Sequence, residues 1–444
     1  MLTLNLAGKK EWKLCEEFVE SLSSSLQQSN QNGQLSVGDS LSLYLQGIAD
    51  RLAEANGLQK NYYRVILHLD PVPNASNYGE GIILFNLGLL AQLPSESHIA
   101  FILGHEMAHD VQDHVFKGIE SKVRVIQGEE YQNAITAIEK ESYNRLALVR
   151  NLNRKMLSQF NEHGRENELE ADSLAFVYLR KAGYWLPGAS QALMLLDSCD
   201  EIPSFKLDIK SFYTFQNYPF QDKWLEKENN PLLGGNLEFF RLPDSLKTHP
   251  SCALRDSLVM VLYNSVDMDS LTGIRFSKRN RQTEMARFEL LEWLKNHGYY
   301  AELQYRTFIL QSEYPENIYL KNTVGLAMYG LFTALHGRMY SRAVPFASAN
   351  TKPEYAEFLQ YLHKLNLSAL KGQYTAYVQE RIPEEGVDDF SDMLYTLTKL
   401  LDEEDPEEKQ YIISEYASKY GETVYTNYLK KQFPDPKPSK KKKK

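Results

Sequence analysis

The stretch FILGHEMAHD, residues 101–110, contains two histidines four positions apart, with a glutamate directly after the first. On a helix, positions i and i+4 lie on one face, so His105 and His109 would point in the same direction. Two imidazoles on one face can bind a single zinc ion, and Glu106 would lie beside the metal as a general base. A catalytic zinc site needs three protein ligands, so this pattern also requires a third ligand elsewhere in the chain.

The residues around this pattern predict the helix that it needs. Apolar residues recur at helical spacing through 93–116, and Ser95 after Pro94 is the predicted N-cap. Residues 38–56 predict an amphipathic helix that ends at Gly57, and the charged segment 117–160 is also predicted to be helical. Further secondary structure is predicted as a helix over 164–185, strands over 62–69 and 82–86, and turns over 70–81. The two strands predict an antiparallel hairpin or small sheet.

The best candidate for the third ligand is Glu168, in the stretch RENELEAD. Asp172 lies four residues further, on the same side of the helix, where it can accept a hydrogen bond from a ligand histidine. Glu166 and Glu170 are rivals by residue type, but they fall on other faces of the helix. The alternative is that Glu168 is one of many surface glutamates in an acidic segment.

The combination of His105-Glu106-x-x-His109 with Arg165-x-x-Glu168-x-x-Ala171-Asp172 resembles the HtpX-like and CAAX-prenyl-protease-like zinc metallopeptidases, which are gluzincins. Four further elements of the chain are similar to this family: PNAS followed by GIILFNLGLL (73–90), His114, KAGYWLPGA (181–189) and THPSCALR (248–255). The resemblance covers about residues 40–260. It implies an α+β, mostly α fold with a small antiparallel sheet, and one Zn²⁺ per chain.

The C-terminal half is predicted to be helical from about residue 252 onward. Gly298, Tyr300 and Pro315 stand at the offsets of a tetratricopeptide (TPR) repeat, whereas Arg287 and Leu303 depart from it. The alternative is a plain helical bundle. The chain resembles the soluble, BepA-like branch, in which TPR repeats follow the catalytic domain. We therefore expect a zinc metallopeptidase domain over 1–260, a helical, TPR-like domain over 261–433 and a disordered lysine-rich tail over 434–444.

Composition narrows the range of partners. The chain has 444 residues and a net charge of −9 although it ends in five lysines, so its body is acidic, which argues against nucleic acid as a partner. No apolar run has the length of a membrane span. The lysine-rich tail is predicted to be solvated, with peripheral membrane contact as the alternative. Soluble members of the resembled branch imply a periplasmic or otherwise extracytoplasmic protein, and the cytoplasm is the alternative.

The sequence therefore predicts a zinc-dependent endopeptidase that hydrolyses extended or misfolded protein segments in protein quality control. His105, His109 and Glu168 would bind zinc, and Glu106 would be the base. An alternative is a zinc-containing scaffold or chaperone-like module that binds proteins with little proteolysis, although such a scaffold has no need of Glu106. A zinc hydrolase that does not act on peptides is a further, weaker alternative.

His249 is the last candidate residue. It precedes Pro250, which disfavours helix at His249. It also follows an irregular aromatic stretch, residues 200–245, that forms either a lid or a well-packed excursion of the core. His249 could donate a hydrogen bond to an oxyanion, with Arg255 as an electrostatic helper, or it could occupy the open zinc position in the resting enzyme. The alternative is a surface histidine in a turn.

Overall fold

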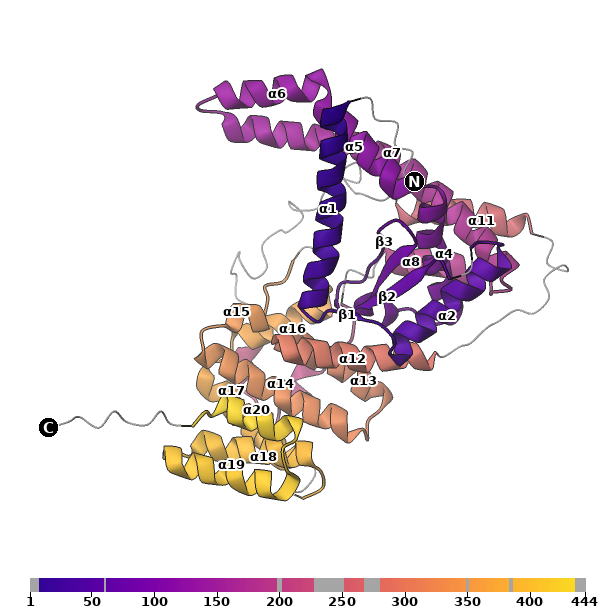
Figure 1. Cartoon of the computed structure of the whole chain (residues 1–444). Coiled ribbons are helices and arrows are strands. Elements are labelled where there is room, and N and C mark those ends of the chain that lie inside the picture. The colour runs from indigo at the N-terminus through magenta and orange to yellow at the C-terminus, as the bar shows by residue number, and fades with distance from the viewer. Residues whose placement is uncertain are drawn as a thin grey trace. The chain divides into compact units, whose positions relative to one another are not determined.

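The computed structural model describes residues 8–59, 61–197, 202–226, 251–266, 280–348, 351–382 and 386–435, without the side chains of 157–163 (Figure 1). They belong to two compact units: residues 1–201 with 240–293, and residues 202–239 with 294–444. No helix within these described ranges has the length and apolar character to cross a membrane.

The first unit contains a small sheet and the helices around it. Its elements are α1 (Lys9–Gln31), β1 (Leu35–Ser36), α2 (Ser40–Ala55), β2 (Arg64–His68), β3 (Ala75–Asn77), β4 (Ile82–Asn86), α3 (Leu87–Leu90), α4 (Glu96–Val111), α5 (His114–Gln127), α6 (Glu129–Lys140), α7 (Arg145–Lys181), α8 (Pro187–Leu196) and α11 (Cys252–Asn264). The helix α12 (Arg281–His297) begins in this unit.

The sheet is mixed, with the strand order β1-β2-β4-β3. The prediction of an antiparallel pair was wrong for β2 and β4, which run parallel. The cause is the connection between them: Gly79 and Gly81, with φ of 82° and 75°, form a tight turn that folds β3 back onto β4. Because β3 runs opposite to β4, the chain returns to the end of the sheet at which β2 begins, and β4 starts there. In the strand order, β3 is an edge strand.

The helix α4 is central rather than amphipathic. All twelve residues from Ser97 to Ala108 are buried, and Ser95 is the N-cap, as predicted. The helix α7 contacts α4 closely because small residues meet there: a Cβ on Gly104 would lie 3.5 Å from the Cα of Ala175. The predicted helix over 164–185 is the second part of α7, which ends at Lys181 and is followed by Ala182 as C-cap and by Gly183 at φ 72°.

The second unit is helical. It contains α9 (Ile209–Phe212), η1 (Asp222–Trp224), α13 (Tyr300–Glu313), α14 (Ile318–His336), α15 (Tyr340–Ala343), α16 (Pro353–His363), α17 (Leu367–Arg381), α18 (Asp389–Asp402), α19 (Pro406–Tyr420) and α20 (Val424–Gln432). Its core is rich in aromatic side chains, which include Tyr305, Phe358 and Tyr374.

The described part of the irregular stretch, residues 202–226, belongs to this second core. Tyr213, Phe215 and Trp224 are at most 3 % exposed. The ring of Tyr218 lies so close to Gly372 of α17 that a Cβ there would be 2.3 Å from the ring. This part is therefore a packed excursion of a core rather than a lid, and residues 227–245 lie outside the described residues. The division into units thus differs from the expected border at residue 260.

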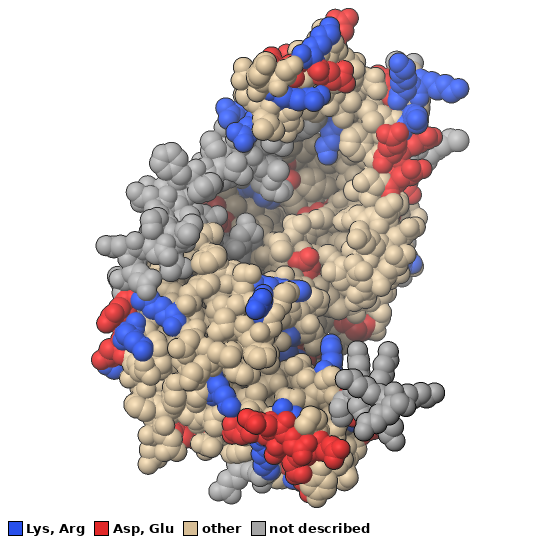
Figure 2. Space-filling model, turned by 90° about the vertical axis from the view of Figure 1, so that its left-hand side faces the viewer, with Lys and Arg blue, Asp and Glu red and all other residues tan. Residues whose placement is uncertain are grey.

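Charge on the surface is mixed. Among the described residues on the face drawn in Figure 2, lysine and arginine lie interspersed with aspartate and glutamate rather than in one continuous basic patch. The lysine-rich end, residues 436–444, lies outside the described residues.

Candidate metal centre

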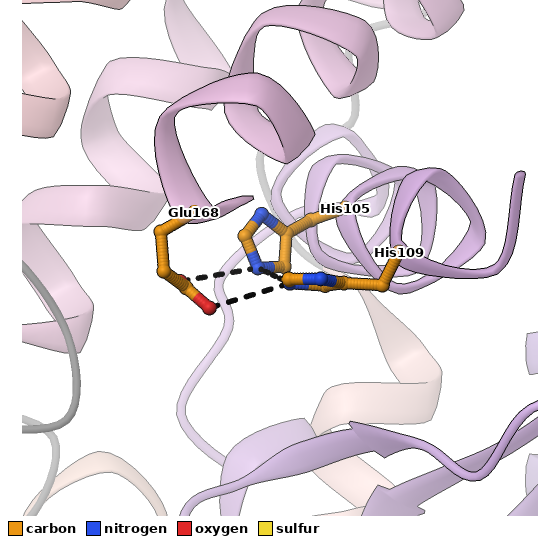
Figure 3. Close-up of side chains that lie close together, drawn as sticks. All are labelled: His105, His109 and Glu168. Atoms are coloured by element: carbon orange, nitrogen blue, oxygen red, sulfur yellow. Dashed lines mark hydrogen bonds and ion pairs between the residues drawn. The ribbon is translucent and has the colours of Figure 1, made fainter. Parts of the chain in front are cut away.

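Three predicted ligands from two helices converge on one point (Figure 3). His105 Nε2 and His109 Nε2, both from α4, lie 3.0 Å apart. Glu168 of α7 places Oε2 3.5 Å from His105 Nε2 and Oε1 3.3 Å from His109 Nε2. Zinc–ligand bonds of about 2.0–2.1 Å in a tetrahedral site separate the ligand atoms by about 3.3 Å. The spacing of these three donors is thus that of one zinc coordination sphere.

The donor chemistry also fits a cation. His105 Nδ1 lies 2.9 Å from Asp172 Oδ1, and a carboxylate only accepts, so Nδ1 donates and a lone pair is left on Nε2. Burial by itself lowers the pKa of His105, but the negative charges of Glu168 and Asp172 raise it to about 10. The site therefore favours positive charge at this point, which a proton or a metal ion can supply.

Asp172 is held in turn by Arg255. The guanidinium donates from Nε to Oδ2 and from a terminal nitrogen to Oδ1, both at 2.7 Å, and its other terminal nitrogen lies 3.3 Å from Glu168 Oε2. Burial raises the pKa of Asp172, but the hydrogen bonds from Arg255 and His105 outweigh it and keep the pKa below its ordinary value. The structure thus places Arg255 against two buried carboxylates, where its charge offsets theirs.

A second contact supports His109, and it was not predicted from the sequence. His109 Nδ1 lies 2.9 Å from His114 Nδ1, and His114 Nε2 lies 3.3 Å from Glu170 Oε2. Glu170, which we expect to lie on another face of the helix from Glu168, thus reaches this neighbouring histidine. The spacing of His114 from His109 was the only signal in the sequence.

Glu106 lies beside the metal ligands in an open cleft of about 380 Å³. The side chain of Glu106 is buried, and its backbone carbonyl accepts a hydrogen bond of 2.9 Å from the amide of Asn77 in β3. The cleft is lined by the edge strand and three helices, through residues 74–77 of β3 and its start, His105, Glu106 and His109 of α4, His114 and Lys122 of α5, and Asn167 and Glu168 of α7. An extended peptide in this cleft would therefore lie beside β3, Glu106 and the three predicted metal ligands at the same time. His249 lies outside the described residues.

Comparison with known families agrees with this geometry. Residues 40–257 match the model of peptidase family M48. This part of the chain is similar to peptidase family M48. The match includes every described candidate residue, from the edge strand to Arg255, and it indicates a metallopeptidase with protein substrates, of a family that is typically zinc-dependent. No curated protein matches the chain.

Proposed function

We propose that the chain is a zinc-dependent endopeptidase that cleaves extended or misfolded protein segments. The observation that carries this proposal is the convergence of His105, His109 and Glu168 next to Glu106 in an open cleft of the part similar to peptidase family M48. Two imidazoles and one carboxylate, with room left for water, form the ligand set of a catalytic rather than a structural zinc site.

The chain's own residues would divide the work of hydrolysis. His105, His109 and Glu168 would hold the zinc ion. When bound, zinc supplies a Lewis acid and lowers the pKa of water. Glu106 would accept a proton from the attacking water and return it to the leaving amine, which is the task of a general base that then acts as an acid.

The edge strand β3 supports an extended substrate. Ser76 pairs with Leu84 of β4, and the flanking backbone bonds run from Tyr78 to Ile82 and from Asn86 to Asn74. Because hydrogen-bonded pairs alternate in an antiparallel ladder, the N–H and C=O groups of Ala75 and Asn77 point away from β4. A peptide can add to such an edge through main-chain hydrogen bonds, which demand extension rather than a particular sequence. This supports unfolded proteins as substrates and a role in protein quality control.

The second unit suits a protein-binding role. The helices α13 and α14 contact each other and are joined by residues 314–317, an arrangement compatible with a TPR-like hairpin. We extend the proposal to this unit as a TPR-like module that binds protein segments. A periplasmic or otherwise extracytoplasmic location is part of the proposal, and separating cell fractions before detecting the protein would test it.

Cleavage of casein, an unstructured protein, tests the function. We expect cleavage by the zinc-loaded protein, loss of cleavage with a chelator, and recovery when zinc is returned. Glu106→Gln should lower turnover by roughly a hundredfold or more while zinc stays bound, because it removes the proton acceptor and keeps the ligands. Chelator-resistant cleavage, or full activity in zinc-loaded Glu106→Gln, would contradict the mechanism. Zinc binding without any cleavage would favour the scaffold or chaperone-like alternative.

A further inference from the structure

The ring nitrogen of His109 that faces away from the metal ligands has a defined partner. His109 Nδ1 and His114 Nδ1 lie 2.9 Å apart, so one of them donates and the other accepts. His109 Nε2 belongs to the ligand group, where it needs its lone pair. The proton of His109 is therefore on Nδ1, which donates to His114. This direction leaves His114 as an acceptor at Nδ1 and a donor at Nε2.

The second half of the chain of hydrogen bonds agrees with this direction. His114 Nε2 lies 3.3 Å from Glu170 Oε2, and a carboxylate is an acceptor. Every donor from His109 through His114 to Glu170 thus meets an acceptor, and the opposite direction would place the lone pair of His114 Nε2 against a carboxylate. The side chain of His114 is 4 % exposed and that of Glu170 is 50 % exposed, so the chain of hydrogen bonds runs from the ligand group to solvent.

The fold brings these residues together through a break between two helices. His114 is five positions after His109, a spacing that does not share a face on one continuous helix. The helix α4 ends at Val111, Asp113 takes a left-handed conformation with φ 56°, and α5 begins at His114. This turn redirects the chain so that His114 lies beside His109. Glu170 comes from α7, two residues after Glu168. The same helix therefore supplies both a predicted metal ligand and the last acceptor in this series of hydrogen bonds.

We propose that His114 and Glu170 are positioning residues that fix the tautomer and ring orientation of His109 for metal binding. The inference rests on the proposed zinc site. His105 has an equivalent support in Asp172 and Arg255, so each ligand histidine is held by a hydrogen bond at Nδ1. The two supports differ in chemistry, because His105 donates to a buried carboxylate and His109 donates to an imidazole.

Zinc affinity measured against a competing chelator tests this proposal without reference to activity. Loss of a hydrogen-bond partner of a metal ligand weakens metal binding by about tenfold to a hundredfold. We expect a loss of this size in His114→Ala and a smaller loss in Glu170→Ala. His114→Gln should recover part of the affinity, since its amide can accept from His109 and donate to Glu170. Glu166→Ala is the matched control, because Glu166 is exposed on the same helix and its removal changes the charge equally.

The Co²⁺-substituted proteins give a second readout. The visible spectrum of bound cobalt reports ligand geometry, and we expect it to change in His114→Ala but not in Glu166→Ala. Wild-type affinity in both His114→Ala and Glu170→Ala would overturn the inference. Glu170 is half exposed, so the Glu170→Ala protein should fold even where His114→Ala does not. If the unmodified protein binds zinc no better than a His105→Ala variant, the proposed zinc site itself fails.

Discussion

Glu106 and Glu168 are both buried glutamates of the same cleft, but their neighbours differ. Glu168 lies near two imidazoles and the guanidinium of Arg255, which all favour a fixed carboxylate. Among the described residues, no ion pair reaches Glu106. In the proposed mechanism Glu168 stays bound to the metal and Glu106 moves a proton, and their different neighbours fit this division of roles.

Replacing Glu168 tests the ligand set at this scale. Glu168→Ala should lose both tightly bound zinc and activity, since it removes one of three donors. Zinc content after dialysis, measured by elemental analysis, decides the outcome. Glu166→Ala serves as the control on the same helix and should keep both properties. Stoichiometric, tightly held zinc in Glu168→Ala would show that another residue is the third ligand.

At the scale of single elements, the edge strand β3 is the part of the site that depends on backbone rather than side chains. Its contact with α4, in contrast, uses a side chain, because Nδ2 of Asn77 donates a hydrogen bond to the backbone carbonyl of Glu106. The turn after it is fixed by Asp110, whose carboxylate accepts a 2.9 Å hydrogen bond from the N–H of Gly81. The helix α4 is thus joined to β3 and to the turn after it at two points.

Ala75→Pro tests whether substrates pair with this strand. Proline removes the outward N–H of residue 75 but leaves the pairing of Ser76 with Leu84. We expect a raised KM for unfolded substrates, with kcat and zinc content changed much less. Ala75→Gly keeps the N–H and is the control. An unchanged KM in Ala75→Pro would argue against binding by strand addition.

The start of α4 gives a prediction about pH. The hydroxyl of Ser95 lies 2.6 Å from His98 Nδ1, and burial lowers the pKa of His98 to about 4, against about 6.5 in an unfolded chain. Between these values the unfolded state binds more protons, so the free energy of unfolding should decrease as pH falls from 6.5 toward 4. The full loss is about 3 kcal/mol.

Denaturation by urea at several pH values, in excess chelator so that pH-dependent zinc binding does not contribute, measures this loss. His98→Gln lacks the titrating ring, so its free energy of unfolding should depend less on pH in that window, although it is less stable at pH 7. Equal pH dependence in the two proteins would show that His98 is not responsible.

The sequence predicted local features better than the pairing of distant ones. Ser95 and Gly183 mark helix ends through the chemistry of single residues, and the i, i+4 spacing of His105 and His109 defines a face without knowledge of the fold. The parallel pairing of β2 with β4 depends on how residues 69–81 return across the sheet, which strand propensity does not encode. The link from Glu170 to His114 joins α7 to the first residue of α5, and no periodicity within either helix predicts it.

At the scale of the whole molecule, the chain contributes to the second unit twice. Residues 202–226 join its core, and the chain then returns to the first unit for α11 before the remaining helices of the second unit follow. The proposed metal centre lies entirely within the first unit, on α4 and α7. A bound ion should therefore stabilise that unit directly.

Calorimetry with and without chelator tests this. Free zinc at a hundredfold above its Kd stabilises the binding unit by about 3 kcal/mol, which raises its Tm by roughly 5 to 10 °C. We expect chelation to lower the transition of the first unit and to leave that of the second in place. In Glu168→Ala the chelator should have no effect. A chelator effect that persists in Glu168→Ala would place the stabilising ion elsewhere.

The early contribution of residues 202–226 has a consequence for how the protein is made. During synthesis Tyr213, Phe215 and Trp224 leave the ribosome before the helices that bury them, and Tyr374, Leu394 and Leu400 lie some 150 or more positions later. At about 5–20 residues per second, this aromatic segment waits roughly ten to forty seconds for its partners. For that interval the first unit can assemble around α4 and α7 while an apolar stretch of the nascent chain stays uncovered. While it is being made, the protein thus contains an unfolded segment of the kind that its own cleft is proposed to bind.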